Sequence, residues 1–185
     1  MKKVYACMAE GLEEVECLAA VDVMRRAGLE VTLVSMGNTK EVTGSHKITV
    51  TADALFSEIS PLDADCLFLP GGMPGTKHLA AHEELCRALK QAAEKGKHLA
   101  AICAAPSVLG GLGLLRGKKA TCYPGFEEKL EGAVYTKQGV VTDGNITTAR
   151  GLGYALDLGL ELVRILVDEK TAANIKAGIQ YDQTE

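Results

Sequence analysis

The hydrophobic positions of this chain follow two periods that alternate along the sequence. Short apolar runs bounded by turn residues are typical of buried strands. They predict strands at 4–8, 30–36, 65–69, 99–102, 119–122, 133–136, 140–142 and 146–149. Apolar residues spaced three or four apart are typical of helices with one buried face. They predict helices at 13–27, 83–95, 104–112, 152–167 and 169–177, with shorter helical segments at 54–59 and 126–130.

The order of these elements predicts the fold class. A strand, a helix and a strand joined by short connections form a right-handed parallel unit. Repeated alternation therefore predicts an α/β fold, a mostly parallel sheet with helices on both faces. Residues 41–51 alternate more weakly and predict a small hairpin or an extended excursion. Because the 185 residues show no internal repeat or linker, we expect residues 1–185 to form a single domain.

Composition narrows the possible functions. The formal charge is −4 at pH 7 and the basic runs are only pairs, so we expect no nucleic-acid partner. No run approaches the roughly 20 apolar residues of a membrane span, and the amino-terminal apolar run is too short for a signal peptide. The six cysteines include no C-x-x-C pair that would indicate a metal site. We expect a soluble cytoplasmic protein with reduced thiols, no metal and no membrane partner.

Cys103 stands where a predicted strand meets a predicted helix. A residue at such a turn points its side chain out of the carboxyl edge of the sheet. The amides that open the following helix, together with the helix dipole, favour an anion there. The position therefore predicts a reactive thiolate. The alternative is a small buried cysteine at the end of a core strand.

Glu16 is the second candidate, in the segment that follows the first predicted strand. It shares a helix face with the apolar residues Leu12, Ala20 and Val23. A carboxyl group on an inward face has a raised pKa unless a charge or donor compensates, which suits it to proton transfer. The alternative is a frayed first turn with Glu16 in solvent.

Gly71 and Gly72 follow the strand predicted at 65–69. Sites of parallel sheets form where loops leave the carboxyl ends of the strands. A Gly-Gly turn lets backbone amides approach a ligand closely, as an oxyanion hole requires, although ordinary tight turns use the same pair. The phosphate-binding patterns G-x-x-x-x-G-K-[ST] and G-x-G-x-x-G do not occur at a strand-to-helix joint.

The four histidines do not supply an evident base for Cys103, although cysteine nucleophiles usually have one. His98 lies five residues earlier on the same strand. That is roughly 16 Å at about 3.3 Å per residue, at the wrong end of the strand. His78 and His82 follow the Gly-Gly loop and could approach the edge, and His46 lies in the 41–51 segment. Surface placement is the alternative for each.

Three motifs together resemble one known family. They are Gly11-Leu-Glu-Glu-Val-Glu16, Leu69-Pro-Gly-Gly72 and Ala100-Ala-Ile-Cys103-Ala-Ala-Pro106. In this order they resemble the ThiJ/PfpI superfamily, most closely its DJ-one-like branch of parkinsonism-associated protein deglycases, over essentially the whole chain. The resemblance implies a flavodoxin-like sandwich, related to the class I glutamine amidotransferases, that forms a homodimer.

The resemblance also implies roles for single residues. Cys103 matches the nucleophilic, oxidation-sensitive cysteine, and Glu16 matches the protonated glutamate that hydrogen-bonds its sulfur. Gly72 and Ala104 match the positions whose backbone amides bind an oxyanion. Tyr123 stands where several relatives have a histidine, and it could orient a substrate through its hydroxyl or serve packing.

The family's activities lead to three hypotheses. The first is a cofactor-free, cysteine-dependent enzyme of the glyoxalase III or deglycase type, acting on small 2-oxoaldehydes such as methylglyoxal or on glycated adducts. The second is a redox sensor or chaperone with an oxidisable Cys103. A cysteine peptidase is disfavoured, because Ala104 stands where that branch has a histidine. Arg150 is interpreted as structural or dimer-associated.

Overall fold

The computed structural model describes residues 1–181. Within them, seven strands form the main sheet, in the order β10-β11-β7-β6-β1-β2-β5. Its strands are β1 (Lys3–Met8), β2 (Glu30–Ser35), β5 (Ala54–Leu55), β6 (Cys66–Leu69), β7 (His98–Ile102), β10 (Val140–Asp143) and β11 (Ile146–Ala149). The pairs are parallel, except that β10 runs antiparallel to β11.

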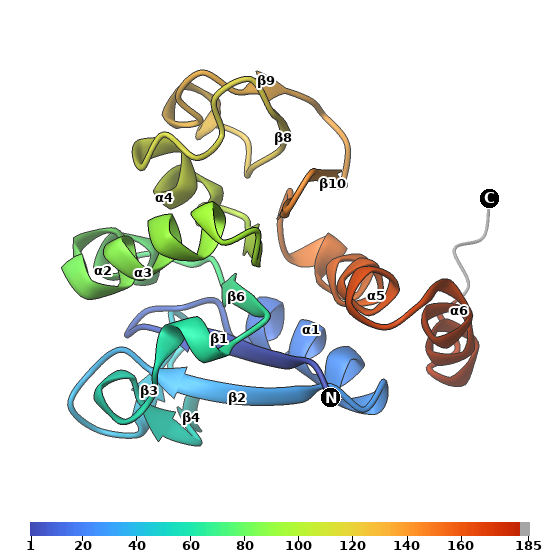
Figure 1. The fold of residues 1–185 in the computed structure, drawn as a ribbon. Helices are drawn as coiled ribbons and strands as arrows, with labels where there is room; N and C mark the ends of the chain where they lie inside the picture. Colours follow the sequence, from blue (N-terminus) through green and yellow to red (C-terminus); the bar gives the residue numbers. More distant parts are fainter. Residues whose placement is uncertain (182–185) are drawn as a thin grey trace.

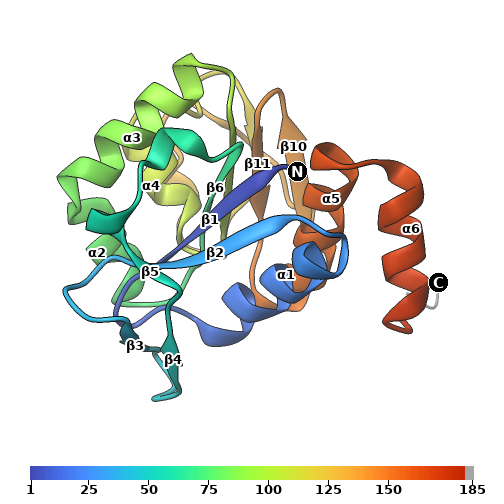
Figure 2. The same ribbon diagram turned by 60° about the horizontal axis from the view of Figure 1, so that its bottom comes forward.

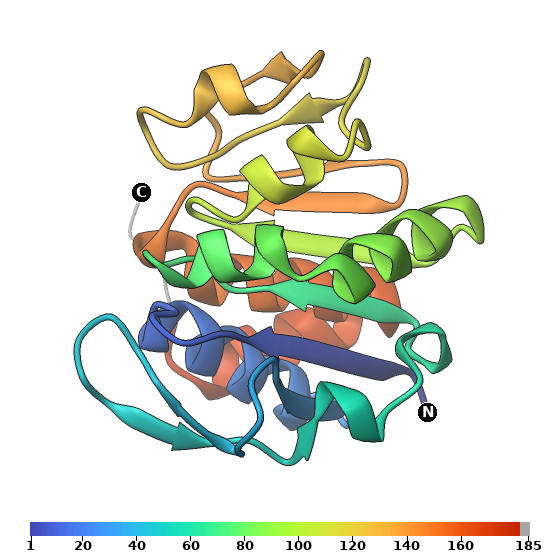
Figure 3. The same cartoon turned by 90° about the vertical axis from the view of Figure 1, so that its left-hand side faces the viewer.

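Helices cover both faces of this sheet (Figure 1). On one face lie α1 (Glu14–Arg26) and α5 (Ala155–Leu166), with α6 (Glu169–Gly178) outside α5. On the other lie α2 (Gly75–Ala81), α3 (Glu83–Glu94) and α4 (Pro106–Gly111), and Figures 2 and 3 show the two helical layers from other sides. This arrangement confirms the predicted flavodoxin-like α/β sandwich. Within residues 1–181, no helix is long and apolar enough to cross a bilayer.

Two hydrophobic cores separate the layers, one on each face of the sheet. One core joins β1 and β6 to α1 and α5, and the other joins the opposite sides of the same strands to α3 and α4. All five residues of β7 are buried, because its two faces are both covered. Because both faces of the strand are covered, residues 99–102 are all apolar and do not alternate with polar residues.

Short elements complete the chain. Small two-stranded sheets pair β3 (Glu41–Thr43) with β4 (Thr49–Thr51) and β8 (Lys119–Ala120) with β9 (Val134–Tyr135). The first pair is the predicted hairpin. The 3-10 helices are η1 (Phe56–Glu58), η2 (Pro61–Asp63), η3 (Glu127–Lys129) and η4 (Leu152–Tyr154).

One helix of the structure was not predicted, and three predicted helical segments differ from the structure. Helix α2 was not predicted, because Leu79 is its only large buried apolar residue and one such position sets no period. The helix predicted at 152–167 is divided into η4 and α5, which begins at Ala155. The segment 54–59 opens with strand β5 before η1, and the segment 126–130 contains only the one turn of η3.

Candidate active site

Three loops meet at one edge of the sheet because they follow neighbouring parallel strands. Strand β6 pairs with β1 on one side and with β7 on the other, so the carboxyl ends of all three lie together. Gly71, after β6, is at the centre of this junction. Its amide donates to the Glu16 Oε2 atom at 3.1 Å. A side chain at Gly71 would overlap both the Glu16 carboxyl and Cys103 Cβ, so only glycine allows this approach.

Cys103 adopts a left-handed backbone conformation, with a φ of 64°. Such a conformation costs about 1–3 kcal/mol for a residue with a side chain and is typical of a nucleophile at a sharp strand-to-helix turn. Two hydrogen bonds hold it: its amide donates to the Ala149 carbonyl at 2.9 Å, and its carbonyl accepts from the Tyr123 amide at 2.8 Å. The side chain is half-buried, at the edge of the sheet and not inside the core.

Glu16 lies in the first turn of α1 and is only 1% exposed. Its carboxyl group is hydrogen-bonded to the Cys103 thiol and accepts from the amides of Gly71 and Leu152. Burial raises the pKa of this carboxyl to about 7, against these hydrogen bonds, and the nearby charge of Glu13 adds to the rise. The predicted inward-facing carboxyl is confirmed, and the frayed first turn is wrong.

The Cys103 thiol is not acidified by its position alone. Burial and the negative charge of an ionised Glu16 raise its pKa, and hydrogen bonds from the amides of Ala104 and Gly72 offset only part of that rise. Helix α4 is short, with six residues, and begins only at Pro106. The expectation that the turn by itself produces a thiolate is therefore wrong.

The protonation of Glu16 bears on whether a thiolate forms. When Glu16 is ionised, the Cys103 S–H donates to its carboxylate, and this hydrogen bond and the negative charge both raise the pKa of the thiol. When Glu16 is protonated, its O–H would donate to a thiolate and no carboxylate charge would oppose the charge on Cys103. The two groups titrate as a pair, and the state with one proton is the state that can hold a thiolate.

Gly72 and Ala104 both direct their backbone amides at the Cys103 sulfur. Gly72 has a φ of 92°, in the left-handed region that favours glycine. A Cβ atom there would also overlap the backbone amide of Glu13. Both residues predicted to bind an oxyanion thus lie beside the sulfur, which suits their amides to a negative charge that develops there.

Tyr123 and Arg150 border the site on the side of the β11 carboxyl end. The Tyr123 side chain is 51% exposed and its ring lies against Gly151, which follows Arg150. The Arg150 amide donates to the Gly139 carbonyl at 2.8 Å. The Tyr123 amide is hydrogen-bonded to the Cys103 carbonyl, so the half-exposed Tyr123 ring lies at the rim of the site.

Each histidine hydrogen-bonds elsewhere. The Nδ1 atoms of His46 and His78 lie 3.1 Å from Glu14 Oε2 and 2.8 Å from the Glu10 carbonyl. His82 caps α3, where its Nδ1 accepts from the Leu85 amide. His98 Nε2 lies 2.8 Å from Thr147 Oγ1. His98 opens β7, so its prediction at the end of the strand opposite to Cys103 is confirmed.

Glu13, Glu14 and His46 offer ligand atoms that lie within 4.8 Å of one another. All three side chains already hold hydrogen bonds within the fold. Glu13 caps α1 by accepting from the Glu16 amide at 2.6 Å, and Glu14 accepts from the His46 and Ile48 amides of the hairpin. The group therefore joins α1 to the β3–β4 hairpin, beside the Glu16 carboxyl.

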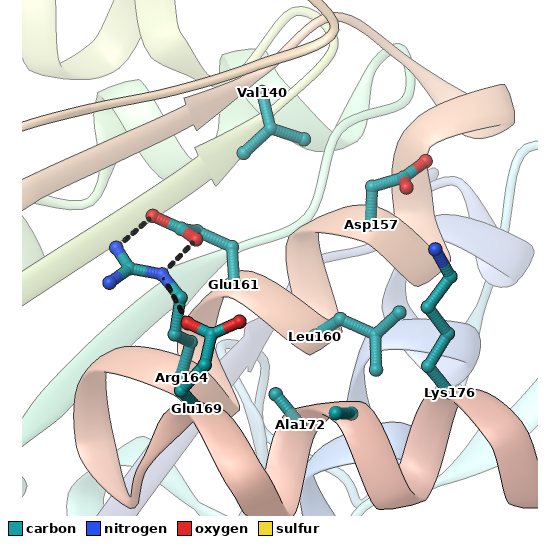
Figure 4. A pocket seen from close by; sticks show the side chains of 9 residues that line it. Val140, Asp157, Leu160, Glu161, Arg164, Glu169, Ala172 and Lys176 are labelled. Carbon is teal, nitrogen blue, oxygen red and sulfur yellow. Dashed lines mark hydrogen bonds and ion pairs between the residues drawn. The ribbon is translucent and has the colours of Figure 1, made fainter.

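Figure 4 shows a hollow between α5 and α6. Its charged groups largely satisfy one another: Arg164 donates twice to Glu161, at 2.7 and 2.8 Å, and Thr142 donates to the same carboxylate at 2.7 Å. The lining of this hollow contains neither Cys103 nor Glu16, so the hollow is separate from the candidate active site.

The hydrogen bond from the Leu152 amide to Glu16 could not be predicted from the sequence. The Leu152 amide reaches Glu16 from η4, far along the chain, and only the folding of α5 against α1 brings the two together. A backbone donor has no sequence identity, so no motif could have indicated it.

The fold and the site define a class: a doubly wound α/β protein with a cysteine on a strand-to-helix turn and a buried glutamate beside it. The sequence profile of the DJ-1/PfpI family matches residues 2–165. The chain belongs to this family.

Individual relatives give the same result. The chain is 32% identical to Parkinson disease protein 7 homolog of Danio rerio over 180 residues, which are 95% of either chain. It is 40% identical to Protein DJ-1 homolog B of Arabidopsis thaliana over 157 residues, but this match spans only 36% of that longer protein. The structure titled "Toxoplasma gondii DJ-1, oxidized" superposes with a TM-score of 0.94 at 35% identity, covering 98% of this chain and 99% of that one.

Proposed function

We propose that this protein is a cofactor-free enzyme that converts small 2-oxoaldehydes to 2-hydroxy acids, as in methylglyoxal to lactate, with early glycation adducts as further substrates. The observation that carries the proposal is the pairing of the Cys103 sulfur with a buried carboxyl, Glu16, whose pKa is about 7. A carboxyl group that titrates near neutral pH can both give and take a proton during turnover.

The reaction begins with addition of the Cys103 thiolate to the aldehyde carbon. The aldehyde oxygen becomes an oxyanion, which the amides of Gly72 and Ala104 stabilise and to which Glu16 gives its proton. The product is a hemithioacetal. The half-exposed Tyr123 at the rim orients the substrate through its hydroxyl.

Glu16, now ionised, takes the hydrogen of the former aldehyde carbon as a proton, and the electron pair of the C–H bond forms an enediolate whose negative charge lies on the ketone oxygen. The carboxyl returns this proton to the neighbouring carbon, and the hydroxyl proton of the former aldehyde oxygen moves to the former ketone oxygen, which leaves a 2-hydroxy thioester on Cys103. Water then cleaves the C–S bond, releases the 2-hydroxy acid, and restores the thiolate and the protonated Glu16. Every proton and electron is balanced without an added oxidant.

The test is lactate formed from methylglyoxal without glutathione. We expect lactate from the wild-type protein and none from Cys103→Ser. Equal lactate from both proteins would exclude Cys103 as the nucleophile. An absence of lactate from both would reject the enzyme in favour of the second function.

The second candidate function is a redox sensor or chaperone in which peroxide oxidises Cys103. Two of the six cysteines, Cys86 and Cys103, are partly exposed, and the other four are buried. Of these two, Cys103 has the amides and the acid that can stabilise a charged sulfur. The related Toxoplasma gondii structure carries the word "oxidized" in its name. Selective oxidation of Cys103 at low peroxide supports this function, and uniform oxidation of the cysteines contradicts it.

We also propose that the protein forms a homodimer through an apolar patch around the start of α1. Val15, Leu18, Ile48 and Leu152 are all exposed there. Ile48 and Leu152 lie beside the first turn of α1, because the Ile48 amide donates to Glu14 and the Leu152 amide donates to Glu16. We expect Leu18→Glu to halve the mass measured by light scattering, and Val134→Glu, an exposed site on β9, to leave it unchanged.

A further inference from the structure

A hollow of about 360 Å³ lies between α2, α4 and the segment that contains η3. Pockets that bind small molecules usually have volumes of about 300–1,000 Å³. We call this hollow the side pocket. Its apolar lining includes Met73, Ala80, Gly111 and Phe126.

The side pocket borders the reactive edge at two places. Met73 directly follows Gly72, whose amide is hydrogen-bonded to the Cys103 sulfur, and consecutive Cα atoms are about 3.8 Å apart. Ser107, also in the lining, donates to the Ala104 carbonyl at 2.6 Å, and the Ala104 amide is the second donor to that sulfur. Each of the two residues whose amides would hold a substrate oxygen is therefore joined to the side-pocket lining, Gly72 through the chain to Met73 and Ala104 through its hydrogen bond with Ser107.

The charges around the side pocket balance. Its lining contains two cations, Lys77 and Lys129, and two anions, Glu128 and Glu131. The Lys129 ammonium lies 4.7 Å from the centre of the Phe126 ring. A pocket without net charge gives no preference to a charged group, whereas a methionine and an aromatic ring favour contact with another ring.

We propose that the side pocket sets the substrate preference of the enzyme by holding an uncharged aromatic substituent on the ketone carbon of the 2-oxoaldehyde. Phenylglyoxal fits this description, and methylglyoxal leaves the pocket unfilled. The inference rests on the proposed function, which supplies the reaction at Cys103.

The test fills the side pocket from its exposed rim. Ala80 lies in its lining, and Ala81 is the next residue of α2 outside it; both are exposed. Ala80→Phe should lower kcat/KM for phenylglyoxal relative to that for methylglyoxal by about tenfold, because losing a few apolar contacts changes discrimination by about 10–200-fold. The matched control, Ala81→Phe, should leave the ratio within about twofold. An unchanged ratio in Ala80→Phe, or an equal fall in both variants, overturns the proposal.

A second readout separates this inference from the proposed function. Cys103 is alkylated with 2-bromoacetophenone, which carries the same phenyl ketone, and with iodoacetamide, and mass spectrometry gives both rates. Ala80→Phe should lower the ratio of these rates by about tenfold, and Ala81→Phe should not. If neither aldehyde is consumed, the proposed function fails, and the alkylation ratio alone decides whether the pocket selects an aromatic group.

Discussion

One titratable side chain opens strand β7 and another directly follows its last residue, and the two differ in how their polar atoms are satisfied. His98 opens the strand, and burial lowers its pKa to about 4, so that it is neutral at pH 7. Cys103 follows the last residue of the strand and interacts with Glu16. His98 is buried, and Cys103 is half-buried at the edge of the sheet. The hydrogen-bond partners of the two side chains differ in whether they can exchange a proton.

The His98 end is a closed chain of hydrogen bonds. A carboxylate only accepts, so Thr142 donates its hydroxyl hydrogen to Glu161 at 2.7 Å. Thr142 therefore accepts from Thr147 at 2.8 Å, and Thr147 accepts from His98 Nε2 at 2.8 Å. These directions place the proton of the neutral imidazole on Nε2. The chain ends at Arg164, which neutralises Glu161, and no proton in it has another place to go.

At the Cys103 end the partners leave a choice. The sulfur receives two amides and shares one proton with a carboxyl group whose pKa is about 7. The proton can reside on sulfur or on oxygen, and a thiolate exists in the second arrangement. The comparison teaches that burial alone does not make a side chain able to exchange a proton; under the proposed function, the buried partner whose pKa is about 7 provides that ability.

The largest effect is expected at the sulfur itself. Cys103→Ser should lower methylglyoxal turnover by at least about 1,000-fold, because a serine hydroxyl is a far weaker nucleophile than a thiolate. Lactate assays measure the loss, and circular dichroism checks the fold. Substantial residual turnover in a folded Cys103→Ser protein would place the reaction elsewhere.

Removing the acid should have the next largest effect. Glu16→Gln should lower kcat by about 10²–10⁴-fold, because the amide cannot carry a proton between the substrate carbons. Cys103 should still react with iodoacetamide, which needs no such transfer. Turnover near the wild-type level in Glu16→Gln would remove the proton-carrying role from the mechanism.

The same residue should give stability an unusual pH dependence. The Glu16 pKa rises on folding from 4.5 to about 7, so between these values the folded state binds more protons than the unfolded state, and stability falls as pH rises. The loss is about 3 kcal/mol, complete above pH 7. Urea unfolding at pH 5 and pH 8 should show this loss in the wild type and a much smaller change in Glu16→Gln. Parallel pH profiles for the two proteins would contradict the raised pKa.

The smallest effect on activity is expected at His98, the residue that opens β7. His98→Leu leaves Thr147 without its donor and should cost about 1–3 kcal/mol in the free energy of unfolding. Its kcat should remain within about twofold of wild type, because the hydrogen-bond chain does not include the sulfur. A fall in kcat comparable to that of Glu16→Gln would mean that the two ends are functionally coupled.

Sequence patterns predicted the frame of the site well. The apolar runs located the strands β1, β6 and β7, and their parallel order brings the loops that follow them to one edge. Helical spacing placed Glu16 on an inward face, and its burial at 1% exposure confirms it. These features depend on local periodicity, which a single sequence carries.

Features that depend on packing between distant segments were not predictable. The raised pKa of Cys103 arises from burial and from a carboxylate on another helix, whereas the local turn indicated the opposite direction. The Leu152 amide on Glu16 has no sequence signature. Helix α2 stayed hidden because Leu79 alone sets no period, and tertiary contacts decide its conformation.

The rate of Cys103 alkylation by iodoacetamide between pH 5 and pH 10 tests the shared proton most directly. If the pair loses its first proton near pH 7, the rate should be half-maximal at about pH 7 and flat from there to pH 10, because the fraction of thiolate in the one-proton state is constant. A rate that keeps rising tenfold per pH unit through pH 10 would contradict the account. It would describe a buried thiol that titrates alone, with Glu16 as a mere neighbour.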